Sequence, residues 1–294
     1  MLVTWKYRER NTFLQSLDPR ARWLTSFLVL FAIVPIWHPY IMAAYFVLAM
    51  VQYFMSGLTW AEMRRVWFFV ILLVVVIIGI NAIVFGRGGP GEIDRMVPHV
   101  LWEKTLNIFG WRPTINLTVE KFAFAATQMM RMLGTAVLFF IIPWTIDPSK
   151  YGVTFAGMGI PYKFAFSMDL AFRFVPTLAR DFFTTMDAQK ARGYEVERVE
   201  GGVITQIRRI APLLVPVVMN AILDGEDITN AMDLRSFGQD RRTWIGKLKY
   251  RTRDYVWIGI GVLVFAACLY INWGLNIEEF FVPDWFYALF GVVP

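Results

Sequence analysis

Two arginines stand near the ends of two similar stretches of this sequence. A guanidinium group in that position can bind an acidic partner. The first stretch reads Ala188-Gln189-Lys190-Ala191-Arg192-Gly193-Tyr194, and the second reads Ala231-Met232-Asp233-Leu234-Arg235-Ser236-Phe237. An arginine in the last turn of a helix either complements the helix dipole and caps free carbonyls or presents a planar fork of donors to a carboxylate on another protein. Because the pattern Ala-x-x-x-Arg-small-aromatic occurs twice, we favour docking on a partner with two matching sites.

Long amphipathic helices are expected to carry the two arginines. Apolar residues recur at helical spacing before each ending, at Phe164, Met168, Ala171, Phe172, Val175 and Leu178 and at Val203, Ile207, Ile210, Leu214, Val217, Ala221 and Ile222. This spacing is typical of helices that lie on or partly in a membrane. Prolines at positions 176, 212 and 216 are expected to kink them. Gly193 and Gly238 are expected to end them, because glycine adopts the left-handed conformation without strain.

The composition indicates what kind of chain positions these arginines. Apolar types make up 57% of the 294 residues and charged types 18%, whereas a soluble domain averages about 45–50% and about 25%. The apolar residues are gathered in runs, so the sequence predicts an integral membrane protein and excludes a disordered chain or an ordinary soluble enzyme. The single cysteine, Cys268, excludes disulfides within the chain, and the two histidines are too far apart for a histidine metal site.

The predicted fold is an all-α integral membrane protein with about five transmembrane helices and long, kinked, amphipathic coupling helices. The apolar runs cover Trp23–Trp37, Tyr40–Met55, Val66–Phe85, Thr118–Ile146 and Tyr255–Trp273. The first two runs are shorter than the roughly 20 residues that a span needs, and the proline between them predicts a tight helical hairpin.

Three parts follow from the distribution of charge. Residues 1–146 are expected to hold an N-terminal cytoplasmic arm and the first four spans, 147–253 a cytoplasmic coupling-helix region, and 254–294 the last span with an external tail. Lysine and arginine gather in the arm and in 147–253 and are absent from the tail after Trp273. The positive-inside rule therefore places the N-terminal arm and residues 147–253 in the cytoplasm and the tail outside.

Smaller patterns leave alternatives open. Alternation in residues 97–108 predicts a short β-hairpin. Asp169 and Arg173, at positions i and i+4, favour an internal ion pair over a catalytic pair. Arg131, inside the fourth span, marks a polar path through the membrane, reaches the membrane interface or bonds a neighbouring helix.

Several kinds of chemistry are excluded. The chain has no G-x-x-x-x-G-K-[ST] sequence for binding ATP, no paired-aspartate cluster, and no convergent set of acids or histidines of the kind a membrane-embedded enzyme needs. We therefore expect no catalytic residue, cofactor or metal in this chain. A conventional ABC-type permease with its own substrate path is the alternative, because the run from Asp187 to Gly193 and that from Ile210 to Pro212 partly match its coupling loop. Such permeases usually supply one coupling end per subunit, whereas this chain has two.

The two arginine endings and several other segments resemble motifs of the transmembrane T component of energy-coupling factor (ECF) transporters, the EcfT/CbiQ-type family. Besides the arginine endings, the matching segments are Ser16-Leu17-Asp18-Pro19-Arg20, Gly159-Ile160-Pro161, Arg173-Phe174-Val175-Pro176 and Pro216. The first ending keeps the family pattern Ala-Arg-Gly as Ala191-Arg192-Gly193. The second reads Leu234-Arg235-Ser236, so it departs from the family at both small positions.

The resemblance implies a non-enzymatic subunit of an ATP-driven importer for vitamins or other micronutrients in a prokaryotic plasma membrane. Two cytoplasmic ABC ATPases, which bind ATP and magnesium, would receive the coupling helices, and a separate membrane S component would bind the nutrient. Nucleic acid is not an expected partner. The implied ATPase-coupling residues are Ala191, Arg192, Gly193, Leu234, Arg235 and Ser236, supported by Asp18, Pro19, Arg20, Arg173 and Pro176.

Overall fold

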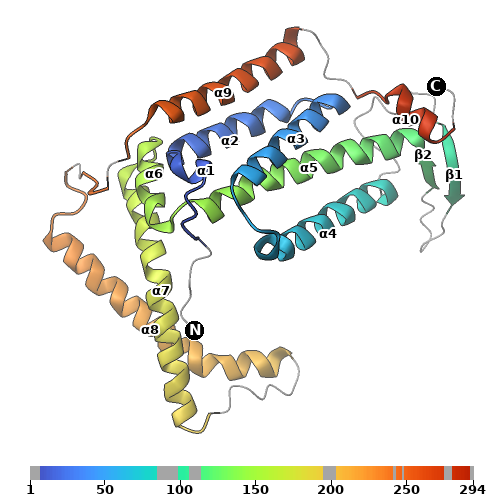
Figure 1. The fold of residues 1–294 in the computed structure, drawn as a ribbon. Coiled ribbons are helices and arrows are strands. Elements are labelled where there is room, and N and C mark those ends of the chain that lie inside the picture. Colours follow the sequence, from blue (N-terminus) through green and yellow to red (C-terminus); the bar gives the residue numbers. More distant parts are fainter. Residues whose placement is uncertain are drawn as a thin grey trace. The chain divides into compact units, whose positions relative to one another are not determined.

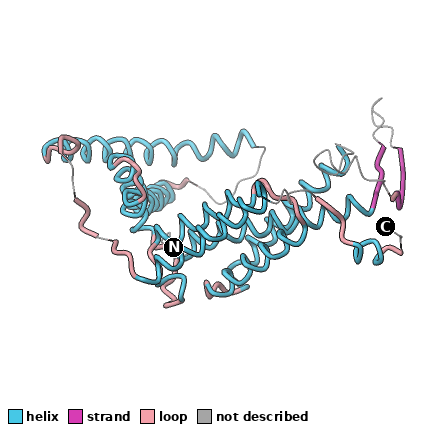
Figure 2. Tube along the Cα trace, turned by 90° about the horizontal axis from the view of Figure 1, so that it is seen from above, coloured by secondary structure: helices cyan, strands magenta, loops and turns pink. Residues whose placement is uncertain are grey.

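The structure, a computed structural model, describes residues 7–84, 99–105, 114–194, 203–240, 243–246, 248–274 and 280–291. Most of these residues are helical, with a single pair of strands (Figure 2). The chain divides into two compact units, one built on Ile146–Lys249 and the other on Arg8–Thr145 with Tyr250–Pro294. We call the first the two-helix unit, after its two long helices, and the second the membrane unit.

The membrane unit is a bundle of apolar helices (Figure 1). Its helices are α1 (Phe13–Ser16), α2 (Pro19–Ile33), α3 (Pro39–Met55), α4 (Trp60–Val84), α5 (Val119–Thr145), α9 (Thr252–Leu269) and α10 (Asp284–Leu289), and α9 continues into a π-helical turn at Tyr270–Gly274. Helix α2 packs along α9, while α3 and α4 pack on α5. Large apolar side chains such as Val47, Phe68 and Leu263 are exposed on the outer faces, as expected of helices surrounded by lipid.

Three helices in the described part of the chain are long and apolar enough to cross a membrane. They cover Trp60–Ile80, Val119–Thr145 and Thr252–Gly274 and correspond to the third, fourth and fifth predicted spans. Helices α2 and α3 have 15 and 17 residues, or about 23 and 26 Å at 1.5 Å per residue, which is short of a hydrocarbon core about 30 Å thick. The predicted α-helical membrane fold is confirmed, with three full-length spans and two shorter apolar runs.

A small hairpin departs from the purely helical prediction. Strand β1 (Val100–Thr105) pairs antiparallel with β2 (Thr114–Thr118), with a register irregularity between Val100 and Trp102. The hairpin predicted within residues 97–108 is therefore confirmed only in part: one strand lies in that range, and its partner strand lies beyond it. Positions 97–98 and 106–108 lie outside the described residues.

The C-terminal segment packs on the first turns of α5. Phe280, Val282 and Tyr287 form an apolar cluster with Val119 and Ala123. The buried carboxylate of Glu120 lies 2.9 Å from Nδ1 of His99, just before β1, and accepts a hydrogen bond from the Tyr287 hydroxyl at 3.4 Å. One buried acid therefore ties the hairpin and the C-terminal helix to the same end of α5.

The two-helix unit contains a short entrance and two long helices. A 3₁₀ turn (Pro148–Lys150) leads into α6 (Tyr151–Gly157), followed by α7 (Tyr162–Ala191) and α8 (Val203–Leu234). Pro176 lies inside α7, and Pro212 and Pro216 lie inside α8. Helix α8 changes direction along its length (Figure 1), as expected where prolines remove backbone hydrogen bonds.

Close packing of α6 on α7 holds the start of this unit together. A Cβ atom placed on Gly152 of α6 would lie 2.6 Å from Cβ of Asp169 and 2.9 Å from the carbonyl oxygen of Ala165. No side chain fits there without displacing backbone, so the glycine is what allows the two helices to approach.

Candidate functional site

Arg192 is the C-cap of α7, and the helix ends there in a Schellman motif. Gly193 follows with a φ of +82°, and its N–H donates to the Lys190 carbonyl at 2.9 Å. The N–H of Tyr194 donates to the Gln189 carbonyl at 3.0 Å. These two bonds satisfy carbonyls that a helix end otherwise leaves without partners. Capping therefore comes from the backbone and does not require the Arg192 side chain.

Arg235 occupies the same place at the end of α8. The N–H of Ser236 donates to the Asp233 carbonyl at 2.9 Å, and that of Phe237 donates to the Met232 carbonyl at 3.0 Å. Ser236 takes the left-handed position with a φ of +54°. The repeated sequence pattern is thus a repeated backbone structure, in which the arginine is the cap and the small residue makes the left-handed turn.

The prediction that Gly238 ends the second helix was wrong. Helix α8 ends at Leu234, and Gly238, although its φ is +89°, lies beyond the Schellman motif. The motif needs its left-handed residue directly after the cap, and in this chain that residue is Ser236.

Both helix ends present cationic tips at the surface. Ala191, Arg192 and Gly193 are exposed, as are Arg235 and Ser236. Leu234 is 89% exposed, a large apolar side chain directly beside the second guanidinium. Such an end offers a charged fork for a carboxylate and, in the second copy, an apolar side chain for a pocket.

The end of α8 is anchored near the start of α7. The Phe237 ring lies 4.6 Å from that of Phe166 and 5.5 Å from that of Tyr162, measured between centroids. Trp244 adds a contact to Tyr162 at 5.9 Å. Since α7 has 30 residues, it is about 45 Å long. The two arginine tips therefore mark opposite ends of α7, a separation that the sequence pattern did not reveal.

The middle family motif, residues 173–176, lies where α7 contacts α8. The predicted ion pair is present: Arg173 Nη2 lies 2.9 Å from the buried carboxylate of Asp169, although Arg173 itself is exposed. One helical turn further, Pro176 interrupts the hydrogen bonding of α7. A shallow hollow of about 330 Å³ is lined there by Leu170, Arg173, Phe174, Thr177, Asp224, Asp227 and Ile228.

The N-terminal family motif, residues 16–20, forms the start of α2 in the membrane unit. Asp18 is the N-cap of α2: its Oδ1 accepts from the Arg20 backbone N–H at 2.9 Å, and its carboxylate also accepts from Nε and Nη2 of Arg20 at 3.0 and 2.9 Å. Pro19 occupies the first helical position, where its missing N–H costs nothing. The Asp18 carboxylate, which accepts these hydrogen bonds, raises the pKa of the Arg20 guanidinium.

Hydrogen bonds connect this motif to the start of α9. The backbone N–H of Asp18 donates to Oδ1 of Asp254 at 2.7 Å, and Oδ2 of Asp254 accepts from the Arg251 backbone N–H at 2.7 Å. The Arg20 guanidinium lies 4.0 Å above the Tyr250 ring. Two helices far apart in the sequence thus begin at one hydrogen-bonded junction.

Arg131 bonds the connection between α2 and α3. Its guanidinium donates to the Ile36 carbonyl just after α2 and stacks 3.9 Å from the centroid of the Trp37 ring. Of the readings that the sequence leaves open, this geometry favours bonding to a neighbouring part of the bundle over a polar path or an interface contact. Among the described residues, no group of three histidines, cysteines or acids could hold a metal ion.

Fold and site together define a multi-helix membrane protein with two cationic helix ends. The family model described as cobalt transport protein, CbiQ, matches residues 10–245, and the chain belongs to this family. The energy-coupling factor transporter transmembrane protein of Lacticaseibacillus paracasei is 26% identical over 91% of this chain and 97% of its own length. That of Thermosediminibacter oceani is 26% identical over 90% and 96%, and that of Staphylococcus aureus 25% over 87% and 91%.

These relatives confirm the resemblance to T components of ECF transporters. The chain is accordingly a membrane component of a transporter, and its apolar helices are of the kind that cross a bacterial plasma membrane.

The left-handed residues lead to a first test, in which one substitution has opposite effects at two glycines. Gly193→Ala should destabilise the end of α7 by about 1 kcal/mol, because alanine is strained at positive φ. Gly225→Ala, in the interior of α8 with open space around it, should stabilise that helix by a similar amount. Ser236→Gly should relieve strain at the end of α8. Amide hydrogen exchange in the last turns of α7 and α8 and around Gly225 measures all three, and equal signs for the two alanine variants would contradict the assignment.

Proposed function

We propose that this chain is the scaffold and energy-coupling subunit of an ATP-driven importer for vitamins or other micronutrients. Arg192 and Arg235 would dock on two cytoplasmic ABC ATPases, and a membrane S component would deliver the nutrient. The observation that carries this proposal is the pair of matching Schellman ends, each with an exposed arginine at its cap, at opposite ends of a helix about 45 Å long. One such end suits one ATPase, and two suit a pair.

Each arginine would pair with a carboxylate in a groove of its ATPase. A charge-assisted guanidinium–carboxylate bond is directional and often bidentate, so it can transmit a movement of the ATPase along the axis of a rigid helix. Ala191 and Gly193 keep the first tip narrow. Leu234 and Ser236 make the second tip broader, so its groove must admit a leucine side chain.

The exposed apolar face of α8 supports a site for the S component. Six large apolar side chains, each at least 47% exposed, follow one another at alternating spacings of one and three residues: Leu214, Val215, Val218, Met219, Ile222 and Leu223. A helix face of this kind is left uncovered only where lipid or another apolar surface meets it. Methionine adds adaptability to a surface that accepts changing partners.

The sidedness of the chain is part of this proposal. With the N-terminus and the two-helix unit in the cytoplasm, both arginine tips face the compartment that holds ATP. The C-terminal segment after α9 would then lie outside, where the absence of lysine and arginine agrees with the positive-inside rule.

Purification of the tagged chain from native membranes tests the proposal directly. Mass spectrometry of what co-purifies should find ATPase subunits that bind ATP and magnesium, together with a small hydrophobic membrane protein. Recovery of the chain alone, or with a soluble binding protein in place of the membrane subunit, would contradict it and favour a conventional permease.

The apolar face of α8 allows a separate prediction. The variant Leu214→Asn/Val218→Asn/Ile222→Asn should lower recovery of the S component at least about tenfold, because each apolar side chain that is buried on binding contributes more than 1 kcal/mol. The ATPases should remain bound. As a control, Glu226→Gln/Asn230→Ser changes exposed positions of the same helix and should leave recovery unchanged. Equal recovery from both variants would assign the face to lipid.

A further inference from the structure

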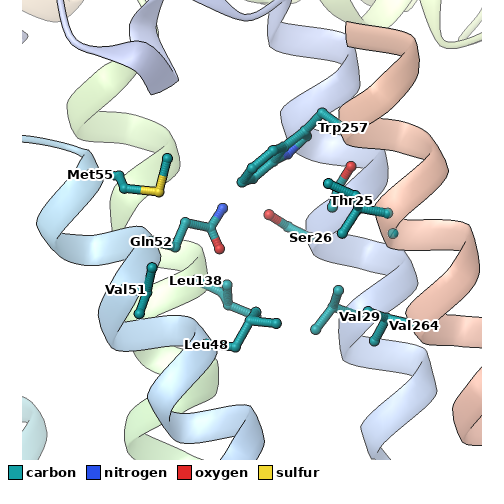
Figure 3. A pocket seen from close by; sticks show the side chains of 12 residues that line it. Thr25, Ser26, Val29, Leu48, Val51, Gln52, Met55, Leu138, Trp257 and Val264 are labelled. Carbon is teal, nitrogen blue, oxygen red and sulfur yellow. The ribbon is translucent and has the colours of Figure 1, made fainter. Parts of the chain in front are cut away.

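We propose that a cavity inside the membrane unit binds one phospholipid, with an ester group at its polar end and an acyl chain along its apolar part. The cavity measures about 190 Å³ and lies between α2, α3, α5 and α9 (Figure 3). Its lining residues are Thr25, Ser26, Val29, Leu48, Val51, Gln52, Met55, Leu138, Trp257, Ile260, Gly261 and Val264. The site is independent of the coupling function proposed above.

Two polar atoms of the cavity have no hydrogen-bond partner among the described residues. Oγ1 of Thr25 and Nε1 of Trp257 are buried without a hydrogen bond. Gln52 is 7% exposed and Ser26 is 2% exposed, and Figure 3 shows the Gln52 amide, the Ser26 hydroxyl and the Trp257 ring directed into the same space from three helices. A buried polar group without a hydrogen-bond partner is unfavourable unless a ligand satisfies it. The tryptophan N–H can only donate, and the ligand must therefore carry acceptor oxygens.

The order of residues along α9 matches the order of groups in a phospholipid. Arg253, exposed in the first turn, is followed at four-residue spacing by Trp257, Gly261 and Val264 one turn further, so these positions share a face. Helix α3 runs the other way, with Gln52 one turn from its end and Leu48 one turn deeper. A cation, then hydrogen-bond donors, then apolar side chains correspond to phosphate, ester and acyl chain.

The size and surroundings of the cavity favour a lipid chain over other occupants. Val51 and Ile260 at its edge are apolar and about half exposed, so the medium at the opening is membrane hydrocarbon. An apolar cavity of about 150 Å³ is enough to bind benzene, and an alkyl chain fits a space slightly larger. A helix, about 10–12 Å across with its side chains, does not. Trp257 also lies near the beginning of α9, at the interfacial level where tryptophan is enriched.

Photo-labelling tests the site. The full chain, purified with its partners and reconstituted with phosphatidylglycerol that carries a diazirine on its acyl chain, should be labelled on the peptide containing Val264. Leu48→Trp fills the cavity and should reduce that labelling at least fivefold. Val47→Trp, at a 60% exposed neighbour that does not line the cavity, should leave it unchanged. Even labelling of all lipid-facing helices, unaffected by Leu48→Trp, would overturn the proposal.

A second variant separates lipid binding from simple cavity filling. Thr25→Val/Trp257→Phe removes the two unpaired polar atoms at nearly constant volume and should lower the lipid retained in native mass spectra about tenfold, the effect of losing one or two membrane hydrogen bonds. Unchanged retention would show that water satisfies these groups. Labelling that appears only after the partners are removed would show that a partner side chain fills the cavity. Either result contradicts the phospholipid site.

Discussion

Reversing both tip charges, as in Arg192→Glu/Arg235→Glu, is expected to remove the ATPases from the purified complex while the S component stays bound. Each substitution replaces a guanidinium with a carboxylate that would face the acidic residue of the ATPase groove. Loss of one partner from a desolvated ion pair costs about 3–5 kcal/mol, and repulsion adds to this. ATP-dependent uptake should therefore fall at least about a hundredfold.

The backbone geometry lets this experiment separate the loss of charge from the loss of helix structure. Both Schellman motifs are closed by main-chain hydrogen bonds from the two residues after each arginine, so the helix ends should survive the change of side chain. Arg180→Glu/Lys249→Glu is the matched control, since it changes the net charge equally at exposed positions of the same unit, away from the helix tips. If the control also loses the ATPases, net charge rather than the tips governs binding. If the tip variant retains them, the two arginines do not dock.

The single variants should differ from each other. Arg235→Ala leaves Leu234 in place, 89% exposed beside the lost charge, and burial of that side chain in a groove would preserve part of the contact. Arg192→Ala leaves only Ala191 and Gly193. The first tip should therefore lose more affinity than the second, which pull-down at increasing salt can rank.

The long apolar helices could be predicted from the sequence because a lipid environment leaves a strong compositional pattern. Helix α5 was expected at Thr118–Ile146 and occupies Val119–Thr145, and the two arginine endings were recognised from their repeated pattern. Hydrophobic runs and repeated motifs are local properties of the chain, and local properties can be read without knowing what packs against them.

What could not be predicted depends on contacts distant in sequence. Ser236, and not Gly238, takes the left-handed conformation at the end of α8. The position of the cap decides which residue must turn, whether or not that residue is a glycine. Phe237 contacts Phe166 of α7 from the segment after α8, and Gln52, Ser26 and Trp257 reach one cavity from three different helices. No periodicity within a single helix indicates such a meeting.

Removing the carboxylate of Asp18 is expected to destabilise the membrane unit more than any other single change to the family motifs. Asp18→Ala deletes an N-cap, worth about 0.5–2 kcal/mol. It also leaves Arg20, whose side chain is only 13% exposed, without its anionic partner, which costs about 3–5 kcal/mol when the pair is buried. Partial exposure of the arginine reduces that figure, so the total loss should be near 3–4 kcal/mol.

The chain supplies its own control for this prediction, because a second Asp-Pro pair begins another helix. Asp147 caps the 3₁₀ turn at Pro148 through the Ser149 N–H at 3.0 Å, and serine stands where Arg20 stands in the first motif. Asp147→Ala should thus lose only a cap, about 1 kcal/mol. Asp18→Asn should fall between the two variants, because the amide oxygen can still cap α2 but carries no charge for the guanidinium. Thermal unfolding of the purified chain in lipid nanodiscs ranks the three, and an equal loss for Asp18→Ala and Asp147→Ala would show that the arginine pair adds nothing to the junction of α2 with α9.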